Sequence, residues 1–184
     1  MYGIGISDVI DGHLVLTEKF SSQPTADGEA AGRSIFSPQP GNVSVFLFKA
    51  EENTFFGYHF EAYERTDAGE QYTGINLQQQ GFGVNLNFWK GISGSQALEL
   101  SLPITKFQYG TWYYYSLQAQ PDGFITAQLW ERDQPANMIF DRTVQLDPEW
   151  AKPGFTFVVT AYQGKMEIDE YQEIELTNEA TVTP

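Results

Sequence analysis

The sequence predicts an all-β fold, a two-sheet antiparallel β-sandwich of the jelly-roll type. Apolar residues alternate with polar ones in almost every patterned segment, and Gly, Pro, Asp or Asn bound these segments. No window of about a dozen residues carries a helical stripe with a period of about 3.6 residues. No internal repeat with a period of about 20 to 50 residues is visible, which argues against a propeller or a β-helix. The many short strands therefore need two stacked sheets.

The chain of 184 residues fits one domain, which we place at residues 13–176. Residues 1–12 are interpreted as a linker or N-terminal extension, and residues 177–184 as a C-terminal tail. A short helical signal lies at 147–150, and residues 21–31 predict an unpatterned polar loop. The expected strands are 13–20, 32–36, 42–49, 56–65, 71–79, 82–89, 97–102, 111–119, 124–131, 142–145, 155–162 and 165–176.

The composition limits the class of partner. There are 24 acidic and 10 basic residues, so the formal net charge is -14. A field of this sign repels nucleic acid and anionic lipid surfaces. The longest apolar runs, such as 45–48 and 157–159, are far shorter than the roughly 20 residues that span a bilayer. The charge and the short apolar runs therefore predict neither nucleic acid binding nor membrane insertion. Because the chain has no Cys, disulfides and thiol chemistry are excluded.

Residues 120–123 (QPDG) predict a tight hairpin turn, with Pro at its second position and Gly in the left-handed conformation. The resulting register puts on the core face the pairs Ala119 with Ile125, Leu117 with Ala127 and Tyr115 with Leu129. The outer face then carries the pairs Gln118 with Thr126, Ser116 with Gln128, Tyr114 with Trp130 and Trp112 with Arg132. These outward rings are interpreted either as cross-strand pairs that stabilise the sheet or as a platform for a ligand.

Residues 56–89 predict a three-strand meander whose apolar side chains turn to the core. Short loops at 66–69 and 80–81 set its two registers. Three outward rows then cross the strands: Tyr63, Tyr72 and Trp89; Glu61, Gly74 and Asn87; and His59, Asn76 and Asn85. Because a glycine within a strand often marks a close approach to the backbone, we expect a trough over Gly74.

This outward face matches the needs of a sugar ring. Pyranoses stack their apolar C–H patches on aromatic faces, and their hydroxyl groups pair with amides and carboxylates. We interpret the stacking residues as Tyr63, Tyr72 and Trp89, and the hydroxyl-binding residues as His59, Glu61, Asn76, Asn85 and Asn87 around Gly74. The alternative is that another segment covers the face and turns its rings into a second small core. His59 taken alone would be an ordinary structural histidine.

Residues 167–173 (EIDEYQE) resemble the E-x-D-x-x-E strand of family 16 glycoside hydrolases, which also have a two-sheet sandwich. In that motif the first Glu is the nucleophile and the last is the acid/base. Here the last position holds Gln172, whose carboxamide cannot transfer a proton. Glu167, Asp169 and Glu173 would share one face of a regular strand. A solvated acidic edge strand, which discourages aggregation, explains this pattern equally well. We therefore expect no enzymatic activity.

No motif in the sequence requires a cofactor. Calcium is the one ion that the acidic residues suit, through Asp8, Asp11 and Asp169 where the first and last strands meet. No EF-hand spacing supports such a site, and acid-rich loops without calcium are the commoner case. The expectation is therefore no required cofactor, with structural calcium as the alternative.

Two segments, 110–135 (GTWYYYSLQAQPDGFITAQLWERDQP) and 164–176 (GKMEIDEYQEIEL), resemble strand patterns of the concanavalin A-like lectin/glucanase sandwich of the laminin G-like kind. The resemblance implies that fold. It also implies a module of an extracellular or cell-surface multidomain protein, which either binds polysaccharide or glycans or acts as a structural spacer. The calcium loop of legume lectins is not recognisable in this sequence.

The leading hypothesis is a noncatalytic carbohydrate-binding module. Its ligand would be a neutral polysaccharide or glycan, because the net charge of -14 disfavours acidic glycans. One alternative is a structural or adhesive module of a larger extracellular protein, which meets protein partners through the same aromatic face. The other is a divergent glycoside hydrolase, which two carboxyl groups about 5 to 9 Å apart in a cleft would favour.

Overall fold

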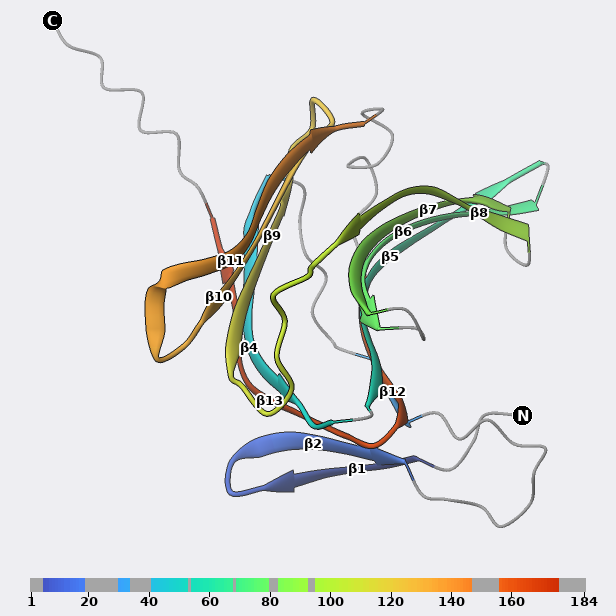
Figure 1. The fold of residues 1–184 in the computed structure, drawn as a ribbon. Helices are drawn as coiled ribbons and strands as arrows, with labels where there is room; N and C mark the ends of the chain where they lie inside the picture. Colours follow the sequence, from blue (N-terminus) through green and yellow to red (C-terminus); the bar gives the residue numbers. More distant parts are fainter. Residues whose placement is uncertain are drawn as a thin grey trace, which may run out of the picture.

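The computed structural model describes residues 5–18, 30–33, 41–52, 54–67, 69–79, 83–92, 95–146 and 156–175, and these form two antiparallel sheets (Figure 1). The seven-stranded sheet has the order β1 (Gly5–Ile10), β2 (His13–Glu18), β13 (Lys165–Ile174), β4 (Val43–Ala50), β9 (Tyr113–Ala119), β10 (Phe124–Glu131), β11 (Gln134–Gln145). The six-stranded sheet has the order β3 (Ala30–Arg33), β12 (Thr156–Gln163), β5 (Phe55–Thr66), β6 (Gly69–Gln79), β7 (Val84–Ile92), β8 (Ser95–Pro103). The predicted all-β sandwich is confirmed, and each predicted strand overlaps an observed one.

Aromatic side chains fill the space between the two sheets. The Tyr58 ring on β5 lies 4.6 Å, centroid to centroid, from both Phe46 and Phe48 on β4 of the opposite sheet. All three side chains have an exposed fraction of 0%, and burying a ring of this size stabilises the fold by about 1.5–3 kcal/mol. Desolvation raises the pKa of Tyr58 well above its ordinary value. This packing fixes β5, and with it the face that β5 turns outward.

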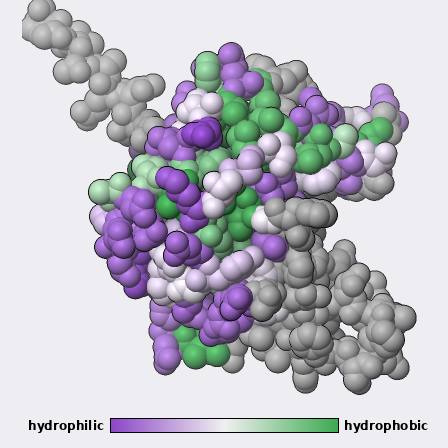
Figure 2. Space-filling view, viewed as in Figure 1, coloured by the Kyte–Doolittle hydropathy of each residue, from purple (hydrophilic) through white to green (hydrophobic). Residues whose placement is uncertain are grey.

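The loop between β8 and β9 packs against the core between the two sheets. Phe107 stacks on Tyr113 with the ring centroids 4.9 Å apart, and Ile104 is buried in the same core. Figure 2 shows apolar residues gathered along the seam between the sheets, with hydrophilic residues over the outer face of the seven-stranded sheet. The apolar surface is thus concentrated between the sheets, as the alternation of the strands requires.

The β9–β10 hairpin has the predicted register, with Ala119, Leu117 and Tyr115 paired to their expected partners on β10. Gly123 adopts φ +88° and donates its backbone N–H to the Gln120 carbonyl at 2.9 Å. The core-facing residues are buried as expected: Leu117, Ala119, Ile125, Ala127 and Leu129. The expectation that Ser116 is not buried is wrong. Its exposed fraction is 7%, because this small side chain lies on a central strand between Val45 and Gln128.

The segment that we expected to be a linker or extension contains a strand. β1 pairs with β2 along its whole length, and Asp11 and Gly12 form the turn with φ +52° and +87°. Two positive φ values suit the tight turn of a hairpin, for which Asp-Gly is a preferred sequence. The Asp11–Gly12 pair is therefore the signal that the interpretation as a linker overlooked.

Several expectations fall outside the described residues: the helical signal at 147–150, most of the loop at 21–31, and the tail at 177–184. In the part of the chain that the structure describes, no helix has the length and apolar character of a membrane span.

Candidate functional site

The candidate site lies on the outer face of the six-stranded sheet, where β5, β6 and β7 run side by side. Figure 1 shows these strands bending together, with the hollow side turned away from the seven-stranded sheet. The β5–β6 register is the predicted one: Tyr63 pairs with Tyr72, Glu61 with Gly74, and His59 with Asn76. The alternation of these strands therefore brings the predicted residues of β5 and β6 to one surface.

The predicted β6–β7 register is wrong by two residues. Trp89 lies opposite Gly74, not Tyr72, and Asn87 lies opposite Asn76. The reason is the connection between the strands: pairing ends at Gln79 with Val84, so four residues lie between them instead of the expected two. Because side chains alternate with a period of two, this shift keeps every residue on its predicted face.

The register places a bulky ring at the centre of the site. The row across the three strands is Glu61, Gly74 and Trp89. Trp89 does not lie in the core between the sheets; it is half-buried on the outer face. Opposite Phe88 and Trp89, the neighbouring strand β8 contains one extra residue, Glu99, which forms a β-bulge.

The close approach expected at Gly74 comes from within the same strand. A Cβ atom on Gly74 would collide with the hydroxyl of Tyr72 and would lie 2.9 Å from its ring atom Cε1. The Tyr72 ring therefore lies over the glycine and occupies part of the expected trough. Its hydroxyl donates a hydrogen bond to Glu61 Oε1 at 3.3 Å. Gly74 thus allows an aromatic ring to lie flat against the sheet beside a carboxylate.

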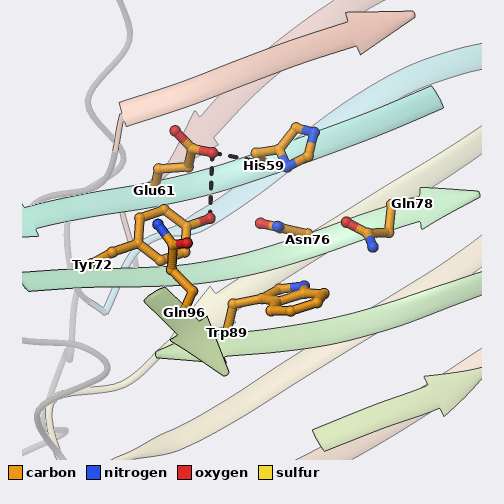
Figure 3. A pocket seen from close by; sticks show the side chains of 7 residues that line it. All are labelled: His59, Glu61, Tyr72, Asn76, Gln78, Trp89 and Gln96. Atoms are coloured by element: carbon orange, nitrogen blue, oxygen red, sulfur yellow. Dashed lines mark hydrogen bonds and ion pairs between the residues drawn. The ribbon is translucent and has the colours of Figure 1, made fainter. Parts of the chain in front are cut away.

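A cavity of about 290 Å³ opens on this face (Figure 3). Its lining residues are His59, Glu61, Tyr72, Asn76, Gln78, Trp89 and Gln96. The sequence predicted five of them and missed Gln78 and Gln96. Gln78 shares its face with Asn76, so the period-two pattern already contained it. Gln96 belongs to β8, opposite Gly91, and no signal in the sequence placed that strand beside the site.

The other predicted site residues have different environments. Asn87 is buried with an exposed fraction of 6% and lies beside Asn76 without lining the cavity. Asn85 donates its side-chain amide to the Gly83 carbonyl at 3.1 Å, which is a contact within the turn region. Tyr63 is placed by its backbone alone, opposite Tyr72. The structure therefore brings together His59, Glu61, Tyr72, Asn76 and Trp89 around the cavity.

His59 is a neutral imidazole at physiological pH. Burial lowers its pKa from 6.5 to about 4, although the neighbouring Asn76 side chain opposes this shift. Its Nδ1 lies 3.9 Å from Glu61 Oε1. Since a neutral imidazole both donates and accepts a hydrogen bond, His59 has the hydrogen-bonding capacity of a group that recognises hydroxyls.

Two polar atoms of β7 are buried without a hydrogen-bond partner among the described residues: Trp89 Nε1, a donor, and Asn87 Oδ1, an acceptor. A buried donor or acceptor left unpaired typically costs about 1–3 kcal/mol. Figure 3 shows the nitrogen edge of the Trp89 indole turned toward the amides of Asn76 and Gln78. Both free hydrogen-bonding groups are therefore carried by the strand that forms one wall of the site.

The acidic residues of β13 belong to the other sheet. Glu167 Oε1 lies 3.0 Å from Lys49 Nζ and 2.9 Å from Lys165 Nζ, and Asp169 lies 3.4 Å from His13. The expectation that Glu167, Asp169 and Glu173 share one face is wrong. A bulge between Ile168 and Glu170 adds a residue, which reverses the alternation beyond it.

Both the expectation of no required cofactor and the alternative of a structural calcium site stay predictions. Among the described residues, no group of three or more His, Asp or Glu side chains lies close enough to hold a metal ion. Asp169 forms its ion pair with His13, and Asp11 forms the β1–β2 turn. The side chain of Asp8 lies outside the described part of the chain.

Comparison with known proteins shows similarity in structure. No protein-family model and no curated protein sequence matches this chain. The CBM2 module of the evolved Dit protein of Lactobacillus casei BL23 phage J-1 is similar with a TM-score of 0.61 and 11% identity, over 95% of this chain and 81% of that one. The carbohydrate recognition domain of Emp46p has a TM-score of 0.58 and 11% identity, over 93% and 86% of the two chains.

A glycoside hydrolase family protein from Mycobacterium thermorestibile has a TM-score of 0.58 and 12% identity, over 89% of this chain and 77% of that one. This chain has a concanavalin A-like fold. The resemblance inferred from segments 110–135 and 164–176 is thereby confirmed at the level of the sandwich. Because these structurally similar proteins include both binding domains and a glycoside hydrolase, the fold alone does not determine the function.

Proposed function

We propose that this protein is a noncatalytic carbohydrate-binding module whose cavity on β5, β6 and β7 holds part of a neutral polysaccharide or glycan. The observation that carries the proposal is the combination of two aromatic rings, Tyr72 and Trp89, with amide, imidazole and carboxylate groups in one cavity. A volume of about 290 Å³ is near the lower end of small-molecule pockets, which suits one sugar residue of a longer chain.

The proposed roles follow from the chemistry of each side chain. Trp89 would stack on a sugar face. Tyr72 would form the adjoining wall, with Tyr63 next to it in the sheet. Asn76 and His59 would pair with hydroxyls, as would Glu61 and Gln78. Three further residues, Gly74, Asn85 and Asn87, would support this surface.

Binding without catalysis is supported by the carboxyl groups around the cavity. Glycoside hydrolases commonly use two carboxyl groups about 5 to 9 Å apart. Among the described lining residues, Glu61 alone carries a carboxyl group, so the pair is incomplete there. The module would act outside the cell or at its surface, where such polymers occur. It would be part of a larger protein.

The test is a pulldown with insoluble polysaccharides together with a glycan array, using the wild-type protein, Trp89→Ala and the control Trp130→Ala. Trp130 stacks on Tyr114 on the other sheet, with ring centroids 5.6 Å apart. We expect a retained glycan that Trp89→Ala releases and Trp130→Ala does not. Retention of no glycan would favour the structural or adhesive module, and release of soluble sugar from a retained polymer would favour the hydrolase.

A further inference from the structure

Charge in the cavity is of one sign. Glu61 is the acidic side chain among the described lining residues, and none of those residues is Lys or Arg. His59, buried and with a pKa lowered to about 4, adds no positive charge at neutral pH. At neutral pH the charged side chain among these lining residues is therefore a carboxylate, on a chain whose formal net charge is -14.

The negative charge stands beside two aromatic faces. Glu61 and Trp89 lie at the two ends of one row across the sheet, with Gly74 between them. The Tyr72 ring covers the glycine and its hydroxyl contacts Glu61 at 3.3 Å. A cation placed near this carboxylate would lie beside the Tyr72 ring, in the cavity that Trp89 also lines, and aromatic faces attract cations because of their quadrupole.

We propose that the cavity prefers glycans that contain a protonated amino sugar over otherwise identical neutral glycans. This inference rests on the proposed carbohydrate function and narrows its ligand from a fully neutral glycan to one that is neutral apart from a protonated amino group. An ammonium group offers three donors and no acceptor, which suits the Glu61 carboxylate, and charge-assisted hydrogen bonds are about twice as strong as neutral ones. The negative field of the whole chain adds to the attraction.

The experiment compares oligosaccharides of the gluco, galacto and manno series that differ only at C2, with a hydroxyl, an acetamido or an ammonium group. Calorimetric titration at mildly acidic pH keeps the amine protonated. We expect the amino form of at least one series to bind about five-fold more tightly than its hydroxyl form, a factor that corresponds to about 1 kcal/mol. That preference should shrink as salt is added, because screening weakens charge interactions.

Two variants locate the preference. Glu61→Gln should remove it, so that the amino and hydroxyl forms bind with equal affinity, and Glu170→Gln should retain it. Glu170 is exposed on β13 of the other sheet, so this control makes the same change in net charge at a distance. Equal binding of the amino and hydroxyl forms, or a preference that survives in Glu61→Gln, would overturn the inference and leave the proposed function standing. Binding of no oligosaccharide in any series would overturn both.

Discussion

The outer faces of the two sheets both carry tryptophan among polar residues, yet they differ in how these groups are paired. On the seven-stranded sheet, Trp112 has Lys49 Nζ at 4.9 Å and Arg132 Cζ at 5.5 Å from its ring centroid, and the His13 ring at 5.4 Å. On the six-stranded sheet, the Trp89 indole nitrogen is buried with no hydrogen-bond partner among the described residues. One tryptophan is surrounded by partners from its own chain, and the other lines a cavity.

This difference separates a structural role from a binding role. Cations over a ring and paired carboxylates are contacts that hold strands together, and the Glu167 contacts with Lys49 and Lys165 are of this kind. Although burial by itself raises the pKa of Glu167, the two ammonium groups hold it below its ordinary value. An aromatic ring that lines a cavity together with amide side chains is instead available to a ligand.

The largest expected effect concerns His59 and pH. Its folded pKa of about 4 lies below the ordinary 6.5, so the unfolded chain binds the proton more tightly. Stability should therefore fall as pH drops from about 6.5 towards 4, by up to about 3 kcal/mol. Chemical denaturation of wild type and His59→Gln across this range measures the effect. A wild-type profile as flat as that of the variant would contradict the assignment of a buried neutral imidazole.

The second effect compares the two tryptophans. Trp89→Ala should weaken glycan binding by about 1–3 kcal/mol, roughly five- to 150-fold, with a smaller loss of stability. Trp112→Ala should leave binding unchanged and lower the free energy of unfolding by about 2 kcal/mol, since it removes a half-buried ring and its cation contacts. Titration and thermal unfolding of both variants measure the two quantities. Loss of glycan binding in Trp112→Ala, with unchanged binding in Trp89→Ala, would mean that the binding face is on the seven-stranded sheet.

A smaller effect is expected at Gly74. The Cβ atom of Gly74→Ala needs the space of the Tyr72 ring, so the ring should move and lose its hydrogen bond to Glu61. We expect a loss of about 1 kcal/mol in affinity or stability. Tyr72→Phe is the matched control, because it removes the hydroxyl and leaves the ring in place. Unchanged affinity and stability in Gly74→Ala would show that the Tyr72 position is unimportant.

Local patterns in the sequence predicted the parts of the site that depend on alternation. The turn at 120–123 and the β5–β6 pairing have the expected registers, because turn chemistry and a buried face together specify them. The β6–β7 pairing was wrong by two residues, since a shift of two preserves the alternation and only the loop length distinguishes the registers. The bulge in β13 could not be predicted either, because one extra residue within a strand leaves no recognisable pattern in the sequence.

Packing between side chains accounts for what the sequence did not reveal. Gly74 predicted a close approach, but only the structure shows that the approaching group is the Tyr72 ring. Gln96 reaches the cavity from β8, whose position beside β7 follows from the order of strands in the sheet. Long-range arrangement of this kind is set by the whole core, so a local pattern does not contain it.

The most direct test of the account is to follow the indole N–H signals of the protein by nuclear magnetic resonance while a bound glycan is titrated. The chain has four tryptophans, so the signals can be assigned with single Trp→Phe variants. We predict that the Trp89 signal shifts on binding, because a sugar stacked on the indole changes the magnetic environment of its N–H, while the Trp112 and Trp130 signals stay in place. A shift at Trp112 or Trp130 with none at Trp89 would contradict the claim that the cavity on β5, β6 and β7 is the binding site.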